Sequence, residues 1–196
     1  MRIGVLALQG DVREHIHALS DCGVDALPVK SAEEIKSLDG LILPGGESTT
    51  IAKLARSFGL FDLIQKRIAE GLPVYGSCAG MILLANKIVG GTHDQETFGG
   101  MDLTVRRNAF GRQVDSFESN LEMAHVGDVR AIFIRAPWVE IASDNVEILA
   151  EVSIEGVKHP VAVRQGKLLA TSFHPELTGD YRVHRYFVSE ICKNGN

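Results

Sequence analysis

The first hundred residues alternate short apolar runs with segments of helical periodicity. Each apolar run is rich in Val, Ile, Leu or Ala and has few polar positions, which is typical of strands buried on both faces of a parallel sheet. Four such strands are predicted, at residues 3–8, 26–29, 41–43 and 74–75. Strands that alternate with helices build a parallel sheet covered by helices, so this half of the chain predicts an α/β fold.

Four helices are predicted between these strands. Apolar residues at helical spacing predict the first over residues 12–22, where Gly23 would end it. Ser31 and Glu34 form a capping box, the signature of a helix start, ahead of a short second helix. The other two are predicted over residues 48–58, with Ser48 as the N-terminal cap, and over residues 61–70.

The pattern after residue 100 is dominated by strands. Strand-like runs occur at residues 103–105, 131–134, 148–152, 161–164 and 168–173. Gln165 and Gly166 predict a tight hairpin between the last two runs, and apolar spacing predicts a final helix over residues 181–192. The segment Gly90 to Gly100 follows no pattern. Together these elements predict one domain over residues 1–196, a three-layer α/β sandwich with a mixed, mostly parallel, flavodoxin-like sheet.

Composition and charge narrow the class of protein. A chain of 196 residues suits one domain, and a net charge of −5 argues against a nucleic-acid partner, whose phosphates require a basic face. The local exception is the basic cluster Arg106, Arg107 and Arg112. The apolar run at the amino terminus ends too early for a membrane span or a signal peptide. Three widely spaced cysteines suggest no disulfide framework and fit the cytoplasm.

Residues 76–80 carry the strongest chemical signal. Gly76-Ser77-Cys78-Ala79-Gly80 follows a predicted strand and precedes an apolar segment, which is the G-x-C-x-G form of a nucleophile elbow. A free cysteine is more often a buried packing residue, so the elbow alone leaves both interpretations open. At the start of a helix, however, the Cys78 thiolate would be favoured by the helix dipole.

A base and a carboxylate follow the last predicted strand. His174 could take the proton of the Cys78 thiol, and Glu176 could hold the imidazole ring in its productive tautomer. In an extended segment residues two apart point the same way, with Pro175 restricting the backbone between them. A strand-ending turn is the alternative for this motif alone, but the elbow and the His-Pro-Glu motif together predict a Cys-His-Glu triad.

Acyl transfer to a thiol also requires donors for a tetrahedral oxyanion. The backbone amide of Ala79 is the first candidate. The second lies in the loop Pro44-Gly45-Gly46-Glu47-Ser48, where two glycines let the amide of Gly46 approach a ligand. A tight strand-to-helix turn is the plainer explanation of those glycines. The other histidines, at positions 15, 17, 93, 125, 159 and 184, are too scattered to predict a metal site.

The early β-α-β half, the Pro-Gly-Gly loop, the elbow and the late His-Pro-Glu motif together resemble class I, triad-type glutamine amidotransferases. Five longer motifs are similar to the glutaminase subunits of pyridoxal 5'-phosphate synthases. They span almost the whole chain: LQGDVREH at 8–15, LPGGESTT at 43–50, RNAFGRQ at 107–113, FIRAP at 133–137 and SFHPEL at 172–177.

This resemblance implies a function and a set of residues. Such a glutaminase hydrolyses L-glutamine to L-glutamate and ammonia through a thioester, and delivers ammonia to a (β/α)-barrel synthase subunit within a large hetero-oligomer that makes pyridoxal 5'-phosphate, vitamin B6. The resemblance places glutamine binding on Gly46, Glu47, Ser48, Arg107, Ile134 and Arg135. A cationic or amide donor suits the substrate's carboxylate, and Glu47 suits its ammonium. No bound cofactor, metal or nucleotide is expected.

Two alternatives stay open at this stage. One is the glutaminase subunit of another amidotransferase, such as imidazole glycerol phosphate synthase, which shares the elbow and the His-Pro-Glu motif but not the motif at 107–113. The other is a noncatalytic binding protein in which Cys78 is a redox sensor. A sensor of that kind would not need His174 and Glu176.

Overall fold

The structure is a computed structural model that describes residues 1–110 and 116–193. Its described residues form a seven-stranded sheet in the order β10-β11-β12-β4-β3-β1-β2, in which β12, β4, β3, β1 and β2 run parallel to one another and the edge strands β11 and β10 run antiparallel. The strands of this sheet are β1 (Arg2–Leu6), β2 (Asp25–Val29), β3 (Gly40–Leu43), β4 (Val74–Ser77), β10 (Glu147–Ile154), β11 (Val157–Gln165) and β12 (Leu168–Thr171). The predicted mixed, mostly parallel sheet is confirmed.

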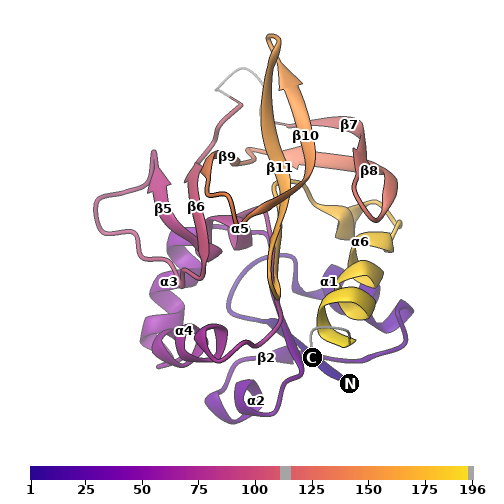
Figure 1. The fold of residues 1–196 in the computed structure, drawn as a ribbon. Coiled ribbons are helices and arrows are strands. Elements are labelled where there is room, and N and C mark those ends of the chain that lie inside the picture. Colours follow the sequence, from indigo (N-terminus) through magenta and orange to yellow (C-terminus); the bar gives the residue numbers. More distant parts are fainter. Residues whose placement is uncertain (111–115, 194–196) are drawn as a thin grey trace.

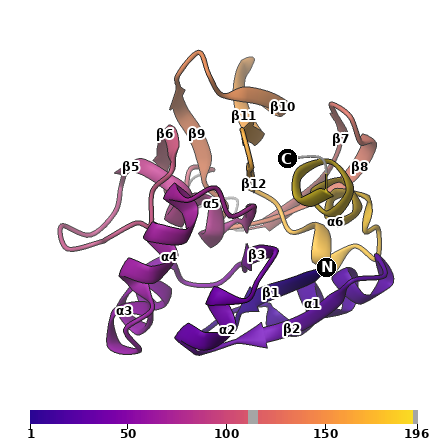
Figure 2. The ribbon, with the colours of Figure 1, turned by 60° about the horizontal axis from the view of Figure 1, so that its bottom comes forward.

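Helices cover both faces of this sheet, as the apolar pattern predicts. They are α1 (Val12–Asp21), α2 (Ala32–Lys36), α3 (Ser48–Ser57), α4 (Phe61–Ala69), α5 (Ala79–Leu84) and α6 (Arg182–Tyr186). Figures 1 and 2 show α3, α4 and α5 on one side and α1 and α6 on the other. The two sides bury separate apolar clusters, one around Ile51 and Ile64 and the other around Leu19 and Phe187. Burial of these clusters is the main force that holds the three layers together.

Two smaller sheets lie beside the central one. One contains β5 (Ala85–Val89), β6 (Met101–Arg106) and β9 (Trp138–Ala142), and the other is the hairpin of β7 (Ser116–Met123) and β8 (Gly127–Ile134). The sequence pattern did not predict β5, β7 or β9. In Figure 1 the long β10–β11 hairpin projects at the top, above the layer of α-helices.

Local chemistry explains most element boundaries and corrects three expectations. The capping box at Ser31 and Glu34 is present at the start of α2. The cap of α3, however, is Glu47 rather than Ser48, because the Glu47 carboxylate accepts a hydrogen bond from the Thr50 amide. The carboxy-terminal helix is not uniform: α6 continues as a π-helix, η2, over Phe187–Lys193.

The third correction concerns the segment after β12. It is not extended, because Pro175–Leu177 forms a 3-10 turn, η1, with proline in its first turn, where its missing amide hydrogen costs nothing. Among the described residues, no helix has the length and apolar character needed to cross a membrane.

The parallel pairing determines where the chemistry lies. Ser77 at the end of β4 pairs with Thr171 at the end of β12, and Leu43 at the end of β3 pairs with Gly76. β1 is the next parallel strand beyond β3. The segments that leave the carboxyl ends of these four strands therefore meet at one edge of the sheet, which is where ligands bind in open α/β folds.

Candidate active site

Cys78 lies on a sharp strand-to-helix turn. It follows β4, precedes α5, and has a φ of 48° and a ψ of −99°, a conformation that non-glycine residues rarely adopt. The flanking glycines are required by space: a Cβ on Gly76 would lie 2.4 Å from the backbone carbon of Gly80, and a Cβ on Gly80 would lie 2.2 Å from the Leu43 carbonyl oxygen. The G-x-C-x-G spacing thus lets the turn pack against β3 while it presents the thiol at the sheet edge.

His174 and Glu176 meet in a buried hydrogen bond. His174 Nδ1 and Glu176 Oε1 are 2.7 Å apart, and both residues are only 4% exposed. The amide of His174 donates to the Ile132 carbonyl on β8, which anchors the segment after β12. The 3-10 turn thus brings the carboxylate to the imidazole ring, although the expected extended geometry was wrong.

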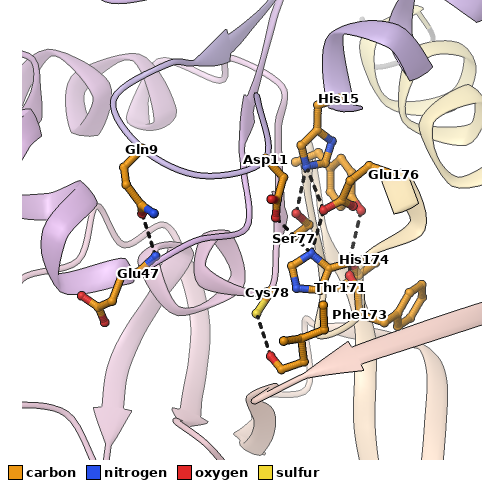
Figure 3. Close-up of polar contacts among 12 residues, drawn as sticks. Gln9, Asp11, His15, Glu47, Ser77, Cys78, Thr171, Phe173, His174 and Glu176 are labelled. Carbon is orange, nitrogen blue, oxygen red and sulfur yellow. Dashed lines mark hydrogen bonds and ion pairs between the residues drawn. The ribbon is translucent and has the colours of Figure 1, made fainter. Parts of the chain in front are cut away.

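The ring of His174 also interacts with Cys78, and Figure 3 shows the thiol beside it. Burial favours the neutral imidazole, but hydrogen bonding and charge attraction from Cys78 and Glu176 outweigh burial and raise the pKa of His174 to about 10. Burial also raises the pKa of Glu176, while the imidazolium opposes that change. The three side chains therefore suit a thiolate–imidazolium pair oriented by a carboxylate.

A second layer of buried polar groups supports this carboxylate. His15 on α1 lies with Nε2 3.0 Å from Ser77 Oγ and 3.5 Å from Glu176 Oε1, and with Nδ1 2.9 Å from His184 Nε2. Burial lowers the pKa of His15 well below its ordinary value and that of His184 to about 3. Both rings are therefore neutral at pH 7, so His15 lies beside Glu176 without adding charge, and His184 contacts His15.

Asp11 offers the ring of His174 a second carboxylate. Asp11 Oδ2 lies 3.5 Å from His174 Nδ1, and burial raises the pKa of Asp11. Asp11, His174 and Glu176 are also the one group among the described residues with ligand atoms within 4.8 Å of each other, the spacing a metal ion would need. A metal there would take Nδ1 away from Glu176 and so remove the contact that orients the imidazole ring.

A small pocket of about 100 Å³ opens at Cys78. Its lining includes Cys78 and Ala79 together with the six residues that the sequence resemblance associates with glutamine: Gly46, Glu47, Ser48, Arg107, Ile134 and Arg135. These residues come from the loop after β3, the start of α5, the end of β6 and the end of β8. The structure thus brings together every residue that the sequence analysis selects for the site.

Two backbone amides suit the role of oxyanion donors. Ala79 is the first residue of α5, where a backbone amide has no partner within the helix. Gly46 has a φ of 152°, and a Cβ there would lie 2.5 Å from Gln9 Oε1. The same Gln9 oxygen accepts a hydrogen bond of 2.7 Å from the Glu47 amide, so the segment after β1 fixes the glycine loop (Figure 3).

Of the two arginines that line the pocket, one is paired with a carboxylate in the described part of the chain and the other is not. Arg107 Nη2 lies 2.7 Å from Glu47 Oε1, so the two groups selected for opposite ends of glutamine face each other. The exposed Arg135 has a φ of 43° and lies at the pocket mouth without a charged partner among the described residues. Arg106 of the basic cluster pairs with Glu140 on β9, away from the pocket. Gly111, Arg112 and Gln113 of the 107–113 motif lie outside the described residues.

Four side chains at the site were not selected from the sequence. Asp11 and His15 lie within the motif at 8–15, and Ser77 is the variable position of the elbow, so the sequence motifs pointed only weakly to these three residues. Gln95 had none, because it lies in the segment that follows no pattern. It lies 2.5 Å from Arg107 Nη1 and 2.8 Å from Ser48 Oγ.

Comparison with known families gives one match across most of the chain. Residues 5–193 match the model of the SNO glutamine amidotransferase family. Among curated proteins, the chain is 59% identical over 197 residues to the pyridoxal 5'-phosphate synthase subunit PdxT of Frankia casuarinae, covering 100% of this chain and 97% of that one. It is 60% identical to the PdxT subunit of Kineococcus radiotolerans, with 96% and 94% of the two chains covered.

Solved structures agree on the fold. A crystal structure of a glutamine amidotransferase superimposes with a TM-score of 0.89 at 51% identity, covering 97% of this chain and 98% of that one. The structure of PurLQS from Thermotoga maritima matches with a TM-score of 0.69 at 15% identity, covering 96% and 97% of the two chains. At that low identity the second match speaks for the fold alone.

Proposed function

The chain belongs to the SNO glutamine amidotransferase family, and from this membership we propose that it is a glutaminase that supplies ammonia for pyridoxal 5'-phosphate synthesis. It hydrolyses L-glutamine to L-glutamate and ammonia. The observation that carries this proposal is the pocket at Cys78, where a thiol, a buried imidazole and a carboxylate meet beside the residues selected for glutamine.

In the proposed reaction, the Cys78 thiolate attacks the side-chain amide carbon of glutamine. The amides of Ala79 and Gly46 donate to the oxyanion that forms. The tetrahedral intermediate collapses to a thioester as His174 gives its proton to the departing nitrogen, which leaves as ammonia. His174 then takes a proton from water, hydroxide attacks the thioester, and glutamate leaves with Cys78 restored. Glu176 keeps Nε2 of the ring directed at the reacting atoms.

Recognition of free glutamine requires partners for its carboxylate and ammonium groups. Arg107 and Arg135 supply the positive charge, and Glu47 supplies an acceptor for the ammonium. The Glu47–Arg107 ion pair supports this assignment. The ammonium of bound glutamine can approach Glu47 while its carboxylate approaches Arg107, so every charged group keeps a partner of opposite charge. The backbone of Ile134, whose carbonyl lies 3.9 Å from Cys78 Sγ, borders the reacting end of the substrate.

The ammonia requires an acceptor, so the chain works with a synthase subunit. We propose that this synthase is a (β/α)-barrel subunit and that the two subunits form a large hetero-oligomer. A location in the cytoplasm is consistent with the three free cysteines, because thiols stay reduced there. The synthase gates the glutaminase by completing the oxyanion hole at the loop of Gly45 and Gly46. This loop is tied to the segment after β1 by the bonds from the Asp11 amide to the Gly45 carbonyl and from the Glu47 amide to Gln9.

Replacement of the nucleophile tests this function. In the complex with the synthase, Cys78→Ala is expected to lower glutamate production by at least about a thousandfold, since the covalent step is lost. Cys22→Ala is the matched control. It removes a half-buried thiol just beyond the carboxyl end of α1, whereas the site lies at the amino end of that helix, and it should keep the wild-type rate. Residual turnover of Cys78→Ala near the wild-type rate would overturn the assignment.

A glutamine analogue with a diazoketone separates the alternatives. It should alkylate Cys78 of the wild-type protein in the presence of the synthase. A protein that stays unmodified under those conditions would instead be a noncatalytic cysteine sensor. A protein that is modified, but that supplies ammonia to imidazole glycerol phosphate synthase and not to the pyridoxal phosphate enzyme, would be the glutaminase of that other amidotransferase.

A further inference from the structure

Gln95 bridges two residues of the glutamine pocket from behind. It lies in the segment between β5 and β6, and its side chain is half-buried. Arg107 Nη1 donates to Gln95 Oε1 at 2.5 Å, and Gln95 Nε2 donates to Ser48 Oγ at 2.8 Å. Arg107 and Ser48 line the pocket, whereas Gln95 does not. Gln95 is therefore linked to the pocket through these two side chains.

The direction of these bonds is determined by chemistry. A guanidinium group can only donate, so the amide oxygen of Gln95 must face Arg107 and its NH2 group must face Ser48. The Ser48 oxygen then accepts, and its own hydrogen is left to donate to another group. The Ser48 side chain lies at the pocket wall, so this hydrogen can donate to a molecule bound there.

The segment around Gln95 is fastened to the helices of one layer. Lys53 Nζ lies 3.2 Å from Asp94 Oδ2, and Arg56 Nη2 lies 2.6 Å from Glu96 Oε1. Phe98 is buried with its ring 4.9 Å from that of Phe61 on α4. The buried Phe98 thus ties the segment to α4. The two exposed ion pairs add little to this anchoring, so the place of Gln95 beside Ser48 does not depend on either pair alone.

From this arrangement we propose that Gln95 is a positioning residue for glutamine. It holds the Arg107 guanidinium and turns the Ser48 hydroxyl so that both donate to the substrate's carboxylate. The inference rests on the proposed glutaminase function. It assigns a role in binding to a segment whose sequence follows no pattern, and it predicts an effect on substrate affinity rather than on the chemical step.

The test is steady-state glutaminase kinetics of the complex with the synthase. Gln95→Glu keeps the shape of the side chain but turns the donor facing Ser48 into an acceptor. The Ser48 hydroxyl then donates to residue 95, and a negative charge stands beside the Arg107 guanidinium. We expect its KM for glutamine to rise about tenfold or more, with kcat within about twofold of wild type. Gln95→Ala should raise KM in the same way, because both bonds are lost.

Asp94→Asn is the matched control. It removes the neighbouring exposed ion pair, which contributes little to stability, and leaves both bonds of Gln95 in place. Its KM should equal that of wild type. A rise in KM for Asp94→Asn as large as that for the Gln95 variants would show that disturbing the segment suffices, and would overturn the positioning role.

Labelling of Cys78 distinguishes failure of the inference from failure of the proposed function. A diazoketone glutamine analogue uses the pocket, whereas iodoacetamide needs only the thiol. The Gln95 variants should require a higher concentration of the analogue for half-maximal labelling and should react normally with iodoacetamide. Unchanged values of both KM and half-maximal labelling overturn the role of Gln95 alone. A wild-type complex that neither hydrolyses glutamine nor reacts with the analogue overturns the function itself.

Discussion

His174 is charged in the fold because of the side chains that touch its ring. Burial alone would lower its pKa, but Cys78 and Glu176 raise it from 6.5 to about 10. Because the folded-state pKa lies above the ordinary value, the charged ring adds stability in full below about pH 6.5. That contribution is lost as the pH rises through about 10. At pH 7 the His174 ring therefore carries its proton, as the proposed transfer of a proton to the departing nitrogen requires.

Removal of the thiol should change this titration. Cys78→Ala leaves only Glu176 to oppose burial, so the pKa of His174 should fall by at least one unit, as measured by NMR titration of its Cε1 proton. Cys22→Ala should leave the midpoint unchanged. A midpoint that stays near 10 in Cys78→Ala would show that the thiol does not hold the proton on the ring.

The neutral pair His15 and His184 has a different role at the same scale. Each ring nitrogen that meets Ser77, Glu176 or the other histidine is buried, and burial keeps both rings uncharged. A second positive charge beside Glu176 would compete with His174 for the carboxylate. Because both rings are neutral, neither competes with the His174 imidazolium for this carboxylate.

At the scale of elements, the glycine loop after β3 determines how closely His174 can approach. A Cβ on Gly45 would lie 2.3 Å from His174 Cε1 and 2.9 Å from Asp11 Oδ2. Gly45→Ala should therefore displace the imidazole and lower kcat by about a hundredfold or more, with the helical circular dichroism unchanged. The rate is measured as glutamate formation in the complex with the synthase.

Gly59→Ala is the control for a glycine in a turn. Its Cβ would meet nothing within 4 Å, but its φ of +69° is left-handed, so the substitution should cost about 1 kcal/mol of stability and leave kcat unchanged. Equal activity of the two variants would show that the close approach of Gly45 to His174 has no catalytic consequence.

The elements that sequence patterns predicted well are those with local signals. Buried parallel strands appear as apolar runs, and the capping box at Ser31 depends on residues three apart. β5 was missed because it follows α5 without any break, and β7 because its inward side chains alternate with Ser, Glu and Asn. At α3, Ser48 looked like the cap, but its hydroxyl is used by Gln95, and Glu47 caps the helix instead.

The candidate site was predictable for the same reason, up to a limit. Cys78, His174 and Glu176 lie in motifs whose spacing carries the chemistry. His15 and Gln95 act through partners 62 and 47 residues away, Ser77 and Ser48, and no local pattern encodes such contacts. Only the order of the parallel strands, which places four strand ends at one edge, brings these residues together.

At the scale of the whole molecule, the two apolar clusters share the same strands. Leu41 and Leu43 of β3 belong to one cluster and Ile42 to the other, and β1 likewise contributes Leu6 to one side and Ile3 and Val5 to the other. Successive side chains of a strand point to opposite faces. If one layer of helices unfolded, it would expose to water one face of the same strands against which the other layer packs. This arrangement predicts one cooperative unit over residues 1–196.

Equilibrium unfolding in urea tests this prediction with two probes. Trp138, the sole tryptophan, lies on β9 in the smaller three-stranded sheet, with its ring 3.7 Å from that of His159 on β11. Its fluorescence reports the contact between the smaller sheet and β11 of the central sheet, and far-ultraviolet circular dichroism reports mainly the helices. Because Val139 of β9 packs into the same cluster as the helices α3 and α4, both probes should give the same midpoint and slope. A fluorescence transition at lower urea would mean that the β5-β6-β9 sheet unfolds first, and that the chain has two cooperative units instead of one.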